Sequence, residues 1–263
     1  MKRVLLTVIL LFLFFGTTKA QLTDFKAQTF TDSTGQELQY RILKPADYDS
    51  SKSYPLVLFL HGAGERGDDN FSQLKWGVSH LAEPKMREKY PAFIVAPQMP
   101  EGAVWSQLIT SRDTTSYTAS MGQTPTKPMR LTIELLKQLQ EEYPVDSNRL
   151  YVTGISMGGF GTFDLIQRFP NKFAAAVPVC GGGDTTTAFM LTDIPLWVFH
   201  GTNDDVVQPE FSRSMIEAIR IAGGSPGYTE YPDEGHVGAW VQAYRNPHLY
   251  EWMFSKELNA GNN

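Results

Sequence analysis

Cysteine is nearly absent from this 263-residue chain, which contains only Cys180. A single cysteine rules out a disulfide within the chain, so a buried apolar core has to supply the stability. Residues 174–180 form an apolar run typical of a buried strand, and Cys180 ends it. We therefore interpret Cys180 as a small buried hydrophobic residue; a reactive thiol is the alternative.

Clustered positive charge and the common signatures of metal and phosphate sites are also missing. The formal net charge is −5, and the lack of a basic cluster argues against nucleic acid as a partner. The sequence contains neither H-E-x-x-H nor a cysteine-rich ligand set, and no phosphate loop of the form G-x-x-x-x-G-K-S/T. We therefore expect no cofactor and no metal. The oligomeric state stays open.

Long apolar runs are rare, and the one at residues 4–15 is too short for a comfortable membrane span. Basic residues precede it, and small residues follow, with Ala20 at the expected cleavage position. This pattern predicts a secretory signal peptide over residues 1–20 and a single mature domain over residues 21–263. We expect an exported protein, periplasmic or secreted, without stable membrane insertion after cleavage; an uncleaved anchor is the alternative.

Segments with strand and helix patterns alternate along the rest of the chain. Continuous apolar runs indicate strands buried on both faces, and apolar residues at helical spacing indicate amphipathic helices. This alternation predicts an α/β fold, with a mostly parallel central sheet, helices on both faces and ligand sites beyond the carboxyl ends of the strands. We expect strands near residues 27–31, 37–44, 55–60, 92–96, 150–153, 174–180, 196–199 and 228–231, and helices near residues 129–143, 157–169, 209–222, 237–244 and 247–257.

The sequence Gly-Ile-Ser-Met-Gly at residues 154–158 lies between a predicted strand and a predicted helix. It matches the G-x-S-x-G elbow, in which the serine occupies a sharp, strained turn and presents its hydroxyl at the edge of the sheet. Side chains at the two glycines would collide with neighbouring elements, and the helix N-terminus favours developing negative charge. This context predicts that Ser156 is a nucleophile, although an isolated match is often an ordinary turn.

A serine nucleophile needs a base, and the chain has five histidines. His236 follows the last predicted strand in a turn before a helix, from which it can reach over the elbow. His61 and His200 each precede a glycine at the end of an apolar strand, as expected of residues that shape loops. His80 and His248 show no partner pattern. We therefore predict that His236 is the base.

The acid that orients this base should follow another strand. Asp204 and Asp205 both do so, and we favour Asp204, three residues after the glycine that ends the strand. Asp205 is the alternative, and either residue could instead be a solvated loop carboxylate. The chain order Ser156, Asp204, His236 is that of α/β-hydrolases and differs from the order in two other groups of serine hydrolases.

An oxyanion hole needs two backbone N–H groups. One should come from Met157, directly after the nucleophile. The other is expected from the glycine-rich segment 61–67, which follows the predicted strand at residues 55–60. Within that segment Ala63 is the first choice and Gly64 the second.

With these motifs, the chain resembles α/β-hydrolases of the secreted esterase group, related to feruloyl and acetylxylan esterases, polyhydroxybutyrate depolymerases and single-domain prolyl-oligopeptidase-like proteins. The resemblance implies a serine carboxylic ester hydrolase that works through an acyl-enzyme. Its substrates would be small or polysaccharide-linked esters, such as feruloyl or acetyl esters. The matching segments lie within residues 35–256 and are 61–67, 96–98, 154–159, 200–204 and 234–236.

Two other functions stay open. A serine peptidase of the prolyl-oligopeptidase-like type uses the same kind of triad, but that family usually adds a β-propeller, for which this chain has no room. A non-catalytic binding module could keep the same fold, but the intact triad candidates argue against it.

Residues 105–126 are rich in serine and threonine and show no clear periodicity. A long loop in a compact domain is usually functional or disordered. We interpret it as the wall or partial cap of a substrate cleft, with plain flexible surface as the alternative. Trp105, at its start, is predicted to bind substrate as an aromatic wall of the acyl pocket, with simple packing as the alternative.

Overall fold

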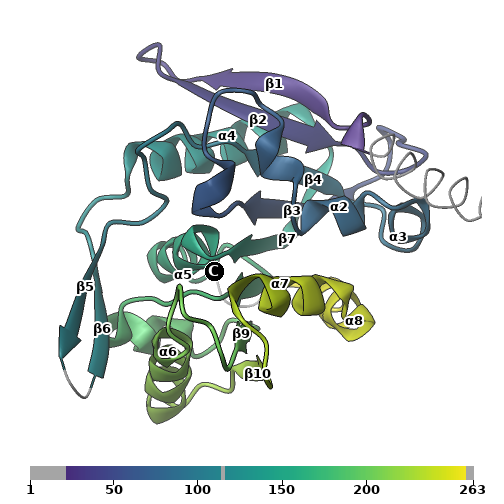
Figure 1. Cartoon of the computed structure of the whole chain (residues 1–263). Coiled ribbons are helices and arrows are strands. Elements are labelled where there is room, and N and C mark those ends of the chain that lie inside the picture. Colours follow the sequence, from purple (N-terminus) through teal and green to yellow (C-terminus); the bar gives the residue numbers. More distant parts are fainter. Residues whose placement is uncertain (1–21, 114–115, 259–263) are drawn as a thin grey trace, which may run out of the picture.

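An eight-stranded mixed sheet forms the centre of the molecule in the computed structural model, which describes residues 22–113 and 116–258 (Figure 1). In spatial order its strands are β1 (Lys26–Thr31), β2 (Glu37–Leu43), β4 (Phe93–Pro97), β3 (Tyr54–Leu60), β7 (Val145–Ile155), β8 (Ala175–Val179), β9 (Trp197–Gly201) and β10 (Gly227–Tyr231). β2 pairs antiparallel with both β1 and β4, and from β4 to β10 all neighbours are parallel.

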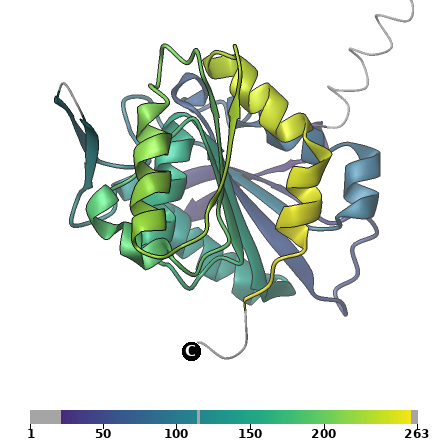
Figure 2. The ribbon, with the colours of Figure 1, turned by 90° about the horizontal axis from the view of Figure 1, so that it is seen from below.

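Helices cover both faces of this sheet (Figure 2). The apolar side chains of the helices divide between two cores, one on each face. The predicted α/β-hydrolase architecture, with a mostly parallel sheet between two helical layers, is confirmed. One layer contains α4 (Lys127–Glu142), α5 (Met157–Arg168) and α6 (Glu210–Ile221), and the other contains α2 (Val78–Leu81), α3 (Pro84–Lys89), α7 (His236–Arg245) and α8 (Pro247–Phe254).

Strand β3 contributes to both cores. Leu56, Leu58 and Leu60 pack in the core that includes α4, α5 and α6. Val57 and Phe59 pack in the core that includes α2, α7 and α8. Successive side chains of a strand point to opposite faces, so a strand covered on both sides shows no polar alternation. This is why the predicted strand is a continuous apolar run and why all seven residues of β3 are buried.

The expectation of an irregular loop at residues 105–126 is wrong, because part of this segment is a hairpin. β5 (Leu108–Asp113) and β6 (Ser116–Met121) pair antiparallel as a separate two-stranded sheet. The hairpin projects from the body of the molecule and contacts α6 (Figure 1). Threonine and tyrosine favour strands, and two strands can pair through their backbones without an apolar face. The sequence therefore lacked the alternation by which a half-buried strand is recognised.

Several short helices were also not predicted. They are α2, α3, and three 3-10 segments at Ala63–Glu65, Ser72–Leu74 and Thr185–Leu191. Each is too short to show the helical periodicity of apolar residues that a sequence pattern needs.

The predicted signal peptide at residues 1–20 lies outside the described residues and stays a prediction, as does the extent of the mature domain. In the part of the chain that the structure describes, no helix combines the length and the apolar character needed to cross a membrane.

Candidate active site

Ser156 occupies the turn between β7 and α5, at the carboxyl end of the parallel strands. Its backbone has φ +53° and ψ −118°, a strained conformation for a residue with a side chain. A Cβ at Gly154 would overlap the carbonyl group of Gly158, and a Cβ at Gly158 would overlap that of Leu60. The two glycines of the motif therefore allow the close approach of β7, α5 and β3 that forms this turn.

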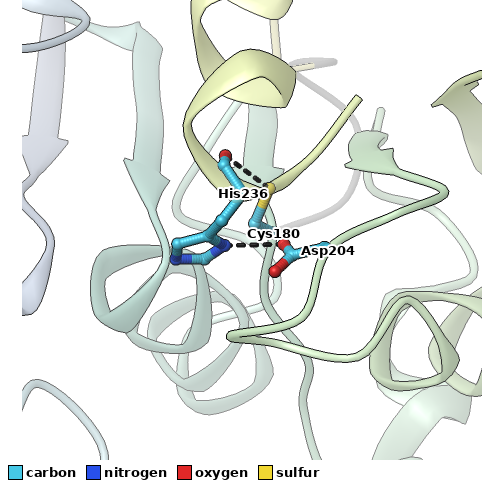
Figure 3. A group of neighbouring side chains, drawn as sticks. All are labelled: Cys180, Asp204 and His236. Carbon is cyan, nitrogen blue, oxygen red and sulfur yellow. Dashed lines mark hydrogen bonds and ion pairs between the residues drawn. The ribbon is translucent and has the colours of Figure 1, made fainter. Parts of the chain in front are cut away.

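His236, the first residue of α7, connects this serine to a carboxylate. Its Nε2 lies 2.9 Å from Ser156 Oγ, and its Nδ1 lies 2.6 Å from Asp204 Oδ2. Figure 3 shows the ring of His236 facing Asp204. An ionised carboxylate can only accept, so Nδ1 donates its proton to Asp204. Nε2 is then free to accept from the serine hydroxyl, as a general base must.

Asp204 lies in the loop after β9, where backbone groups fix its side chain. Its side chain has no exposed surface, and its Oδ1 accepts the backbone N–H groups of Val206 at 3.0 Å and Val207 at 2.9 Å. Burial by itself raises the pKa of Asp204. Hydrogen bonds from His200, from His236 and from the backbone amide of Val207 nevertheless hold this pKa well below the usual range. Asp205 is exposed. The structure thus brings Asp204, and not Asp205, to His236.

The candidate oxyanion donors lie on the two segments that flank Ser156. Met157 is the first residue of α5, and Ala63 and Gly64 are exposed residues of a 3-10 turn that follows β3. A Cβ added to Gly62 would lie 3.6 Å from Cγ1 of Ile155, which places this turn beside the end of β7. The role of these amides stays a prediction.

His61 shapes the start of this turn, as its position before a glycine indicated. Its Nε2 accepts the backbone N–H of Met99 at 2.9 Å, so the ring proton lies on Nδ1 and is donated to the carbonyl of Gly62 at 2.6 Å. Burial lowers the pKa of His61 to about 4. The ring is therefore neutral at physiological pH and serves as a fixed link between two loops.

Trp105 lies in the core. It is fully buried, and its indole N–H donates to the carbonyl of His61 at 3.0 Å. Its ring meets the His61 ring edge to face, with 5.3 Å between centroids, and a Cβ at Gly161 would lie 2.5 Å from Trp105 Cβ. A ring without exposed surface cannot wall an open cleft. The predicted substrate-binding role of Trp105 is therefore corrected in favour of packing against α5.

Cys180 lies directly after β8, with a φ of +50°. Its Sγ donates to the carbonyl oxygen of His236 at 3.8 Å (Figure 3). Burial, with a further contribution from the charge of Asp204, raises the pKa of this thiol far above its usual value. The interpretation of Cys180 as a small buried residue rather than a reactive thiol is confirmed.

Cys180, Asp204 and His236 also form a group whose potential metal-ligand atoms lie within 4.8 Å of one another. Each of these atoms already has a partner in the protein. The thiol donates to a carbonyl, and Nδ1 of His236 donates to the carboxylate. Ligation would require both the thiol and Nδ1 to lose their protons. The arrangement therefore suits proton transfer better than cation binding.

A second histidine, which the sequence did not indicate as a site residue, lies at the carboxylate. His200 has no exposed surface, and its Nε2 lies 3.2 Å from Asp204 Oδ2. The sequence feature that could have indicated this contact is a histidine at the end of an apolar strand, four residues before an acid in the following loop. The sequence pattern predicts only a loop-shaping role for His200.

Comparison with known proteins gives three kinds of match. Residues 31–223 match the family model named Esterase. A bifunctional acetylxylan esterase/xylanase of Neocallimastix patriciarum is 27% identical in an alignment of 202 residues that covers 75% of this chain and 26% of the relative. Dipeptidyl-peptidase 5 of Porphyromonas endodontalis is 21% identical in an alignment 287 residues long, which covers 92% of this chain and 38% of the relative. The chain thus spans well under half the length of these curated relatives.

A solved structure described as a thermostable esterase is 40% identical and superimposes with a TM-score of 0.82. The match covers 90% of this chain and 64% of that chain. This likeness supports the assignment of the α/β-hydrolase fold.

Proposed function

The chain belongs to the Esterase family, and on this premise we propose that it is a serine carboxylic ester hydrolase with Ser156, His236 and Asp204 as its triad. The observation that carries the proposal is the continuous hydrogen-bonded series from the serine hydroxyl, through the ring of His236, to the buried carboxylate. In this series the serine proton has an acceptor, and the resulting imidazolium has a counter-charge.

In the acylation step, Nε2 of His236 takes the proton of Ser156 while Oγ attacks the ester carbonyl carbon. The negative charge that develops on the carbonyl oxygen is stabilised by the backbone N–H groups of Met157 and Ala63, with Gly64 as the alternative to Ala63. Loss of one such donor typically costs about 3 kcal/mol in the barrier. The bond to the alcohol oxygen then breaks, and His236 returns the proton to the leaving alcohol.

In the deacylation step, His236 takes a proton from water, and the hydroxide attacks the acyl carbon. The bond between that carbon and Ser156 Oγ breaks, and His236 returns the proton to the serine. Asp204 keeps its negative charge throughout and stabilises the imidazolium in both steps. These steps need neither a metal nor an organic cofactor.

For the substrate we propose an acyl group linked to polysaccharide, in the form of an acetyl or feruloyl ester. The similarity to an acetylxylan esterase/xylanase supports this choice, although this chain matches only 26% of that protein. The basic, apolar and small-residue pattern at residues 1–20 supports export, which would bring the enzyme to such material. Nucleic acid and a stable membrane association are not expected.

A serine peptidase is the second candidate. The similarity to dipeptidyl-peptidase 5, which covers 92% of this chain, favours it. The same triad geometry serves amide and ester hydrolysis, so the arrangement of the three side chains does not discriminate between them. A non-catalytic binding module is the third hypothesis, and the hydrogen-bonded triad argues against it.

A substrate panel tests these proposals. Purified protein and its Ser156→Ala variant are incubated with p-nitrophenyl acetate, methyl ferulate and a peptide anilide. Ester turnover that disappears in the variant supports the esterase. Turnover of the anilide alone would overturn it in favour of the peptidase, and an absence of both turnover and fluorophosphonate labelling would favour the binding module.

A further inference from the structure

The carboxylate of Asp204 contacts a second histidine besides His236. His200, near the end of β9, is fully buried, and its Nε2 lies 3.2 Å from Asp204 Oδ2 and 2.9 Å from the carbonyl oxygen of Val207. Its Nδ1 lies 2.7 Å from Oγ of Ser212. A single carboxylate oxygen, Oδ2, therefore lies between two imidazole rings.

The acceptors around His200 determine where its protons lie. Nε2 faces a carboxylate and a carbonyl oxygen, neither of which can donate, so Nε2 carries a proton. Nδ1 faces Ser212, whose single hydroxyl proton points to the carbonyl oxygen of Gly181 at 2.8 Å. If Ser212 donated to Nδ1 instead, Oγ of Ser212 and the carbonyl oxygen of Gly181 would face each other without a proton between them. Two buried acceptors in contact are costly. All contacts are satisfied only when Nδ1 is protonated as well.

We propose that His200 is a positioning residue of the triad and that it acts as a buried imidazolium. It holds the carboxylate of Asp204 in the orientation in which Oδ2 faces Nδ1 of His236, while backbone amides fix the other carboxylate oxygen. His200 does not touch the reacting atoms. The proposal rests on the proposed function, because it assigns a role within that triad.

The surrounding charges fit a buried cation. An isolated imidazolium would be costly to bury, but the ionised Asp204 is in direct contact with it. On β10, Glu230 is the register partner of His200, and its pKa is lowered by Arg213 first and by the charge of His200 among smaller causes. The other titratable groups at this carboxylate are His236 on α7 and Cys180 after β8.

The positive charge has a consequence for the base. A positive charge beside Asp204 should oppose the addition of a second positive charge at His236 during turnover. Removal of the charge should therefore move the acid limb of the activity profile to higher pH. A residue that only fills space would not move this limb.

Two substitutions separate the charge from the contact. His200→Gln removes the charge but keeps an N–H donor, and His200→Leu removes both. The exposed His248→Gln is the matched control, because the His248 side chain is 78% exposed. The assay is kcat and KM for p-nitrophenyl acetate across pH, with thermal unfolding recorded for every variant.

We expect His200→Gln to keep kcat within about threefold of wild type and to move the acid limb of kcat/KM upwards by about half a pH unit or more. His200→Leu should lower kcat by about tenfold or more with little change in KM. His248→Gln should change neither. An unmoved acid limb in His200→Gln would overturn the imidazolium, and an undiminished kcat in His200→Leu would overturn the positioning role.

A readout independent of turnover separates this proposal from the proposed function. Proton–nitrogen NMR of the wild-type imidazole rings should show two ring N–H groups for His200, assigned by their loss in His200→Gln. A single N–H group would overturn the proposal even if the wild type cleaves no ester. If His200→Leu does not fold, His200→Asn, which shortens the side chain and loses the charge, takes its place in the kinetic test.

Discussion

The hydroxyl oxygen of Ser156 lies 2.9 Å from Nε2 of His236, although 80 positions separate the two residues in the sequence. In the sheet, β7 precedes the serine, β10 precedes the histidine, and β8 and β9 lie between these two strands. The carboxyl ends of parallel strands meet at one edge, so the loops after β7, β9 and β10 converge there. The order of the strands thus brings Ser156, Asp204 and His236 together.

Replacement of the serine tests this geometry most directly. Ser156→Ala removes the attacking oxygen, so kcat/KM for p-nitrophenyl acetate should fall by at least about a thousandfold. The exposed Ser51→Ala should keep full activity, and thermal unfolding should show both variants folded. Substantial turnover by folded Ser156→Ala would assign the chemistry to another residue.

The acid is tested by a matched pair of neighbours. Asp204→Asn keeps the shape of the side chain but loses the charge that stabilises the imidazolium, and kcat should fall by about four orders of magnitude. Asp205→Asn, on an exposed side chain, should stay within about twofold of wild type. The opposite result would make Asp205 the acid and contradict the hydrogen bond from His236.

The sequence could indicate which residues would lie together at this edge of the sheet, because these residues follow recognisable strands. Ser156 and Asp204 each come shortly after an apolar run that forms a central strand. His236 begins a helix after the last strand, where only a short turn intervenes. At such positions the strand alone determines which edge of the sheet a residue reaches.

Other features depend on contacts between distant segments, which no local pattern reports. The local sequence around Trp105 does not indicate whether its ring faces a cleft or the core. The hydrogen bond that fixes this ring joins Trp105 to His61, 44 positions away. The contact of His200 with Asp204 depends on a loop that turns back after β9. The hairpin of β5 and β6 is held by backbone pairing, which leaves no apolar periodicity.

The buried His61 should make the protein less stable in acid. Its pKa in the folded state is about 4, against 6.5 for an unburied histidine, so the unfolded chain binds this proton more readily. The free energy of unfolding should therefore decrease as the pH falls from about 6.5 to about 4, by about 3 kcal/mol from this residue. Urea unfolding at several pH values measures the slope.

His61→Gln isolates this contribution. The glutamine has no proton to gain in this range, so the stability of the variant should vary less between pH 6.5 and pH 4. If His61→Gln kept the wild-type slope, the acid sensitivity would have to come from other groups.

The glycines near the elbow differ in what they tolerate. A Cβ at Gly158 would overlap the Leu60 carbonyl group, so Gly158→Ala should destabilise the fold by about 3 kcal/mol or prevent folding. A Cβ at Gly64 would meet nothing within 4 Å, so Gly64→Ala should change stability by less than about 1 kcal/mol. Urea denaturation compares them, and equal losses would contradict the close contact between β3 and α5.

Trp105 distinguishes a packing role from a substrate contact. Trp105→Phe removes the indole N–H, leaves the buried carbonyl of His61 without its donor and reduces packing against α5. The free energy of unfolding should fall by about 2 kcal/mol. Because the ring has no exposed surface, KM should stay within about twofold for both methyl ferulate and p-nitrophenyl acetate.

The neighbouring Val104→Ala, at a residue that is 40% exposed, is the control and should cost little stability. A several-fold rise in KM for methyl ferulate alone would show that the Trp105 ring contacts the aryl group. The assignment of Trp105 to core packing would then be wrong.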